Sequence, residues 1–93
     1  PWDVQTAAEA AEAAAQRGWL ETAQWLLESV QAQAGNDVGF WKQLARVHER
    51  REQWQTAILC WEKVRKVSPR DEDAARQINA LSASATIARA GLK

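Results

Sequence analysis

One histidine and one cysteine, His48 and Cys60, are the only residues of their kinds available for nucleophilic or metal chemistry. A Cys–His pair needs mutual hydrogen-bond reach and a third group that orients the base. His48 instead lies among Leu44, Ala45 and Val47 on the apolar side of an expected helix, where a packed histidine is the usual finding. Cys60 lies at the edge of the apolar stripe of the next helix, as a small buried hydrophobe would. We therefore expect structural roles for both.

Other arrangements that carry out chemistry are also lacking in the sequence. A closed zinc site takes four ligands, more than one histidine and one cysteine supply. Glu9 and Glu12 lie about one turn apart on an expected polar helix face, which is typical of surface rather than of an acid–base pair. There is no glycine-rich loop of the kind that holds phosphate. The sequence thus predicts no enzyme, no cofactor and no metal.

The charge balance restricts the partners. Twelve basic and twelve acidic side chains cancel, whereas nucleic-acid binders are usually strongly basic. No apolar run approaches the roughly 20 residues that a membrane span needs, and no basic amphipathic face suits a membrane surface. We therefore expect a protein or peptide partner, with no nucleic acid and no membrane.

The cellular location is only weakly indicated. A lone cysteine favours a reducing compartment such as the cytoplasm. The chain carries no signal peptide and does not begin with Met, so we expect it to be part of a longer protein.

Helix-forming residues dominate, glycine and proline are sparse, and the sequence predicts an all-α fold in one domain. Asp3 and Asp37 suit N-caps, Gly18 suits a left-handed helix end, and residues 71–73 place three carboxylates at a helix start. These signals predict five helices, over about residues 4–17, 19–33, 38–51, 53–67 and 72–91.

The chain matches itself when it is shifted by 34 residues (54 − 20), and we call this shift the repeat interval. The pairs that this shift aligns are Leu20 with Trp54, Ala23 with Ala57, Leu27 with Trp61, Val30 with Val64, and Leu44 with Ile78. A single interval of this size indicates stacked helical hairpins.

The width of each apolar face indicates how many neighbours a helix has. The third helix has a broad apolar arc that two neighbours must cover, with Trp41 among its residues. We expect Trp41, Trp54 and Trp61 to pack in the core. The fifth helix carries one narrow stripe, which predicts a cap, formed by Ile78, Leu81, Ala85, Ala88 and Leu92.

Residues 38–71 resemble a tetratricopeptide repeat, and the repeat interval matches that family's period of roughly 34 residues. The family's Trp, Leu, small residue, Ala, Phe and Pro positions carry Trp41, Leu44, Ala45, Ala57, Trp61 and Pro69, while His48 replaces the usual Tyr. Residues 4–37 form a degenerate first repeat, and residues 72–91 are similar to the cap helix of such arrays. The resemblance implies two helix-turn-helix hairpins plus a C-terminal cap in a right-handed superhelical stack. It also implies a protein-interaction scaffold with a concave groove.

In such a stack the first helix of each hairpin forms the groove wall. The resemblance therefore implies groove residues on three helices, namely Glu9, Glu12, Lys42, Arg46, Glu49, Arg50 and Arg76. Lys42, Arg46 and Arg50 follow one another at one-turn intervals, and this basic ladder suits an acidic segment or a C-terminal carboxylate. In the alternative interpretation, surface ion pairs with the three glutamates neutralise the ladder and the groove is idle.

Two other functions stay open. Trp25 and Leu59 lie opposite the apolar stripes of their helices and are one repeat interval apart, so a stack would place both on one outer edge. They are either scattered apolar surface or an outer contact ridge. A structural unit that assembles into homo-oligomers is therefore the alternative function, and a regulatory piece of a larger enzyme is a third.

Overall fold

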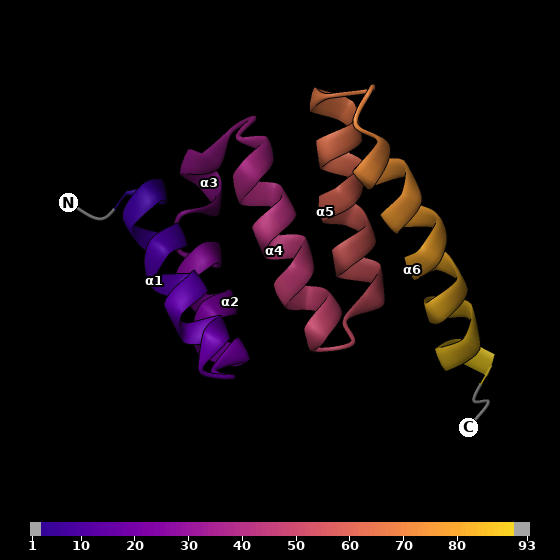
Figure 1. Cartoon of the computed structure of the whole chain (residues 1–93), viewed down its shortest axis with the longest axis horizontal. Coiled ribbons are helices and arrows are strands. Elements are labelled where there is room, and N and C mark those ends of the chain that lie inside the picture. Colours follow the sequence, from indigo (N-terminus) through magenta and orange to yellow (C-terminus); the bar gives the residue numbers. More distant parts are fainter. Residues whose placement is uncertain (1–2, 91–93) are drawn as a thin grey trace.

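The computed structural model describes residues 3–90, and that part of the chain is helical with no strand. In chain order the helices are α1 (Val4–Gln16), α2 (Leu20–Glu28), α3 (Gln31–Ala34), α4 (Val38–Arg50), α5 (Trp54–Val67) and α6 (Glu72–Ala90). Figure 1 shows them following one another across the molecule, so that the two ends of the chain lie far apart. The all-α prediction is confirmed.

Consecutive long helices pack in pairs. The helix α1 packs against α2, α4 packs against α5, and α6 packs against α5. The helix α4 also contacts α1 and α2, and so it joins the first pair to the second. The principal extents of 44 × 31 × 19 Å describe an elongated arrangement in which each helix contacts few others.

An aspartate at a regular interval begins three of the long helices. Asp3 accepts a hydrogen bond from the backbone N–H of Thr6 at 2.7 Å, and Asp37 accepts one from Phe40 at 3.2 Å. Asp71 accepts one from Ala74 at 3.1 Å. Each cap satisfies a backbone donor that has no partner within the helix. The predicted caps Asp3 and Asp37 are confirmed, whereas Asp71, predicted in the first turn of its helix, lies before it as a third cap. Each of the three is one repeat interval from the next.

The segment 19–33 is divided into two helices, so the prediction of one helix there was wrong. Ser29 Oγ donates a hydrogen bond to the carbonyl of Leu26 at 2.6 Å. The N–H of Val30 donates to Leu27, three residues back, and Val30 leaves the helical region with φ −116° and ψ 9°. A side chain that bonds the backbone locally competes with the helical ladder, and a three-residue hydrogen bond tightens its last turn. Residues 3–90 therefore contain six helices rather than five.

Burial follows the same repeat interval as the sequence. The buried pairs are Ala11 with Ala45, Ala23 with Ala57, Leu27 with Trp61, Val30 with Val64, Phe40 with Ala74, and Val47 with Leu81. Of the three tryptophans expected in the core, Trp61 is buried, whereas Trp41 and Trp54 are partly buried against it.

The helix α6 carries one apolar stripe. Leu81 is buried, and Ile78 packs partly buried against the core. The side chain of Ala88 and the whole of Leu92, which were predicted to extend this stripe, lie outside the described residues. The described part of the stripe faces α5, its main neighbour.

Breaking the contact between α6 and α5 is expected to destabilise the whole chain. Leu81→Glu places a charge at a buried position, and removal of residues 72–93 uncovers the neighbouring face of α5. We expect either change to lower the melting temperature by more than about 10 °C, because 1 kcal/mol corresponds to about 4–8 °C in a domain of this size. Circular dichroism measures the transition.

The matched control is Ile87→Glu on the same helix, because the Ile87 side chain is 54% exposed. It should leave the transition almost unchanged. Equal melting temperatures for Leu81→Glu and the parent chain would contradict the capping role of α6.

Candidate functional site: the groove between α1 and α4

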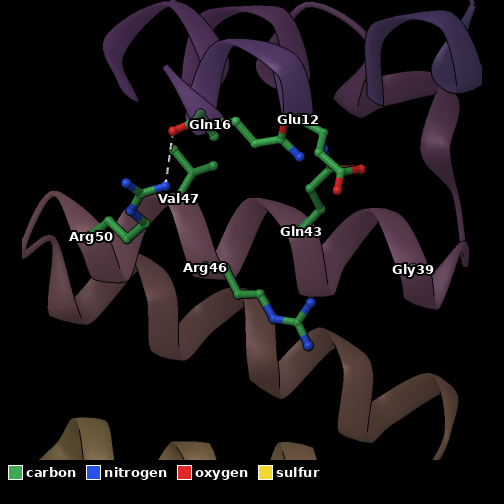
Figure 2. Close-up of a pocket in the computed structure, with 8 residues that line it drawn as sticks. Glu12, Gln16, Gly39, Gln43, Arg46, Val47 and Arg50 are labelled. Carbon is green, nitrogen blue, oxygen red and sulfur yellow. Dashed lines mark hydrogen bonds between the residues drawn. The ribbon is translucent and has the colours of Figure 1, made fainter. Parts of the chain in front are cut away.

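A groove of about 400 Å³ lies between α1 and α4. It is lined by Glu12, Ala15 and Gln16 from α1 and by Gly39, Gln43, Arg46, Val47 and Arg50 from α4 (Figure 2). A second hollow of about 700 Å³ adjoins it at the N-terminal ends of the two helices and shares Gly39 and Gln43 with it. Together the two hollows follow the length of α4.

Two side chains of α4 hold the backbone of α1. Gln43 Nε2 donates a hydrogen bond to the carbonyl of Ala8 at 2.8 Å, and Arg50 Nη1 donates to the carbonyl of Ala15 at 3.1 Å. The second of these bonds is visible in Figure 2. The sequence separation of Gln43 and Arg50 on α4 equals that of their acceptors, Ala8 and Ala15, on α1. The two helices therefore run parallel over about two turns in a fixed register. Gln43, at the boundary of the two hollows, was missed by the sequence analysis, because its contact depends on a distant segment.

Lys42, the first member of the predicted ladder, pairs with two carboxylates at the start of α6. Its Nζ lies 2.7 Å from Asp71 Oδ2 and 3.9 Å from Asp73 Oδ2. Arg76 Nη1 lies 3.8 Å from Asp73 Oδ1. Lys42 therefore connects α4 to the start of α6, and Arg76 forms an ion pair within α6. Neither residue lines the groove.

The Lys42–Asp71 contact also sets the acidity of the carboxylate. The hydrogen bond from Lys42 is the largest influence that lowers the pKa of Asp71 below its ordinary value of 3.8, and the N–H of Ala74 contributes in the same direction. Asp71 is therefore both a helix cap and the ionic link between α6 and α4.

Arg46 is the member of the ladder that stays open. Its side chain is exposed, and no hydrogen bond or ion pair joins it to another residue within 3–90. In Figure 2 the guanidinium extends away from α1, whereas Arg50 turns toward the α1 backbone. Glu12 lies on the opposite wall, also with no such partner in the described chain. The groove thus has an unpaired carboxylate on its α1 wall and an unpaired cation at its α4 edge.

The other two predicted glutamates lie elsewhere. Glu49 accepts a hydrogen bond at 2.7 Å from the indole Nε1 of Trp61, whose buried N–H needs an acceptor. Glu9 accepts a long hydrogen bond of 3.5 Å from Gln5 within α1. The structure therefore brings Glu12, Arg46 and Arg50 together at the groove, but not Glu9 or Glu49.

His48 and Cys60 are packed, as predicted. His48 is 2% exposed, and its Nδ1 lies 2.6 Å from Gln53 Oε1. Burial raises the pKa of the Cys60 thiol to about 12, and the nearby Glu28 carboxylate adds to this shift. At neutral pH the thiol is therefore protonated, whereas a nucleophilic cysteine must be a thiolate.

Within residues 3–90 no three or more His, Cys, Asp or Glu side chains gather as a metal site would require. None of the helices described there has the length and apolar character needed to cross a membrane.

Large apolar side chains are exposed outside the groove. Trp25 on α2 is 66% exposed and Leu59 on α5 is 64% exposed, so both point away from the core as predicted. Trp19 is also exposed, and the Arg17 guanidinium lies 5.4 Å from the centre of its ring.

Comparisons with protein-family models, curated proteins and solved structures gave no match to this chain. The function is therefore inferred from the geometry of its own residues.

Loss of the Asp71–Lys42 link should change the response to acid. Asp71 has a lower pKa when folded than unfolded, so its contribution to stability is fully present above about pH 4 and is lost as the pH falls through the lowered pKa. Asp71→Asn should therefore be less stable than the parent at neutral pH, and this difference should shrink in acid. Urea unfolding at about pH 7, 5 and 3 measures it.

Glu62→Gln is the control, since Glu62 is exposed on α5 and has no hydrogen bond or ion pair with the described residues. A difference between Asp71→Asn and the parent that stays constant over this pH range would show that the link does not contribute.

Gln43→Ala should loosen α1 from α4. It removes the 2.8 Å hydrogen bond to the Ala8 carbonyl, and a typical hydrogen bond contributes about 1 kcal/mol to stability. We expect a fall of about 1 kcal/mol in the free energy of unfolding, measured by urea denaturation. Gln55→Ala, an exposed change on α5, should have almost no effect. An equal loss of unfolding free energy in Gln43→Ala and Gln55→Ala would contradict a stabilising role of the Gln43–Ala8 hydrogen bond.

Proposed function

We propose that this chain is a protein-interaction module of the tetratricopeptide type, and that the groove between α1 and α4 binds an extended, acidic segment of a partner protein. The observation that carries this proposal is the open groove between two parallel helices, with the unpaired Arg46 at its edge. The regular spacing of the capping aspartates and of the buried pairs supports the repeat architecture. Two hairpins closed by α6 as a cap, in a right-handed superhelical stack, are part of the same proposal.

The length of the groove fits a short segment. From Gly39 to Arg50 the axis of α4 rises about 17 Å, at about 1.5 Å per residue. An extended chain advances about 3.3 Å per residue, so about five residues of a partner fill this length. Gly39, at the end of this length where the second hollow adjoins, has no side chain to obstruct the path.

The charges at the groove favour a carboxylate in the bound segment. The Arg46 guanidinium is free to grip a carboxylate with two parallel hydrogen bonds. Arg50 uses Nη1 for the Ala15 carbonyl and keeps further N–H groups on the same guanidinium. Glu12 on the opposite wall repels a second acidic group placed beside it. The best occupant therefore has one acidic residue near Arg46 and a neutral or basic residue near Glu12.

Peptide titration tests this proposal. Acidic peptides of about five to eight residues should bind more tightly than basic peptides of the same length, because Arg46 and Arg50 outnumber Glu12 at the groove. Binding should weaken between low and physiological salt, since exposed charge pairs are screened over about 8–10 Å. Arg46→Ala should weaken acidic-peptide binding about tenfold, as expected when one charged hydrogen-bonding partner is lost. Fluorescence anisotropy of labelled peptides measures these affinities.

Arg70→Ala is the control, because it removes an exposed cation of the loop between α5 and α6, outside the groove. Preference for basic peptides, or equal affinity in the Arg46→Ala and Arg70→Ala variants, would rule out this mode of binding.

A further inference from the structure

The outer faces of α2 and α5 carry the two most exposed of the large apolar side chains described, Trp25 and Leu59. Each lies on the side of its helix away from the buried residues, Leu27 on α2 and Trp61 on α5. We call these two side chains and the charged residues around them the outer ridge. Exposed tryptophans have much apolar area to bury in a contact, and they are enriched at protein interfaces.

The charges of the outer ridge have opposite signs on the two helices. Glu21 and Glu28 lie about one turn before and one turn after Trp25, and so they share its face of α2. Neither α2 nor α3 contains a basic residue.

On α5 the surroundings of the apolar residue are mainly basic. Lys63 and Lys66 follow Leu59 by about one and two turns, which places them on its face of the helix. Lys63 Nζ lies 5.8 Å from the centre of the Trp41 ring, so Lys66 is the more available of the two. Glu62, the one acidic residue of α5, comes three residues after Leu59 and shares the same face, so the two lysines leave this face with a net positive charge. The ridge therefore has an acidic half around Trp25 and a basic half around Leu59.

The two halves are linked through the end of α4, which packs against both α2 and α5. Arg51, the C-cap residue of α4, donates a hydrogen bond from Nη1 to Gln24 Oε1 on α2 at 2.6 Å. Glu28 on α2 is also close enough to Cys60 on α5 to act on its thiol electrostatically. The acidic and the basic half are thus held in a fixed relation by α4.

We propose that two copies of this chain associate through the outer ridge about a two-fold axis. Trp25 of each copy packs on Leu59 of the other, and the glutamates of each α2 face the lysines of the other α5. A two-fold interface is formed by the same patch on both copies, so it requires a patch that complements itself. An apolar centre with one acidic and one basic half meets that requirement. This association uses α2 and α5, and so it does not depend on the groove between α1 and α4.

The strength of the association should be modest. The ridge extends over the short helix α2 and one face of α5, which is a small area compared with a stable interface of about 1,200–2,000 Å². We therefore expect a dimer that forms reversibly as the concentration rises from about 10 µM to about 1 mM, and that weakens with added salt. Sedimentation equilibrium of residues 1–93 at low and high salt measures both effects.

A charge exchange tests the orientation of the two copies. Glu21→Lys and Lys66→Glu, each made alone, place like charges at both symmetric contacts of a homodimer, and each should raise the dissociation constant about tenfold or more. An equal mixture of the two variants allows a heterodimer in which both contacts again join opposite charges. The mixture should therefore associate about as tightly as the parent chain.

Matched charge changes outside the ridge serve as controls. Glu9→Lys on α1 and Arg70→Glu in the loop before α6 make the same charge reversals, and they should leave the dissociation constant within about threefold of the parent value. Trp25→Glu combined with Leu59→Glu should abolish the dimer, with the helical circular dichroism signal retained because both side chains are exposed.

Three results would each overturn the proposal. The first is a single monomer mass over the whole concentration range. The second is an association that Trp25→Glu with Leu59→Glu leaves intact, which would place the contact on another surface. The third is a mixture of Glu21→Lys and Lys66→Glu that associates no better than either variant alone, which would exclude the two-fold pairing of α2 with α5.

Discussion

Close approach of helices through alanine is the constraint on which the rest of this structure depends. Four alanines are fully buried in two pairs, Ala11 with Ala45 and Ala23 with Ala57, and the members of each pair are one repeat interval apart. A single methyl group allows neighbouring backbones to come near, and a larger side chain there would force the packed helices apart. The close packing lies within the pairs α1 with α2 and α4 with α5. Between the pairs, side chains of α4 reach carbonyl groups on α1 and fix its register.

The groove lies where α1 meets α4. Two alanines, Ala8 and Ala15, and the longer side chains of Val4, Gln5, Glu12 and Gln16 form its α1 wall. The walls are polar because α4 is strongly divided between a buried side and a charged side. Of the charged side, Lys42 is used to attach α6 and Arg50 to hold α1, which leaves Arg46 for another molecule. The attachment of α6, the hold on α1 and the proposed binding of a partner therefore use members of one ladder of cations.

Local chemistry made much of this structure predictable from the sequence. The capping aspartates, the left-handed Gly18, the packing of His48 and Cys60, and the exposure of Trp25 each follow from a residue and its near neighbours. The break after Ser29 was missed, because helical periodicity continues across it while one hydroxyl competes for a backbone carbonyl. The partners of Lys42 and Glu49 were also missed. They depend on Asp71 and Trp61, so the pairing is decided by tertiary packing, and a helical wheel contains no information about it.

The groove and the outer ridge share no residue, since the first belongs to α1 and α4 and the second to α2 and α5. Occupation of one surface therefore does not block the other. A dimer formed through the ridge carries two grooves, and a partner with two acidic segments can occupy both at once. The second segment then binds at the effective concentration set by the linker between the segments, which can raise the overall affinity by about 10²–10⁴ without a new contact. If both proposals hold, a weak contact between copies and a groove with a single free arginine would together give selective binding to partners that repeat their acidic segment.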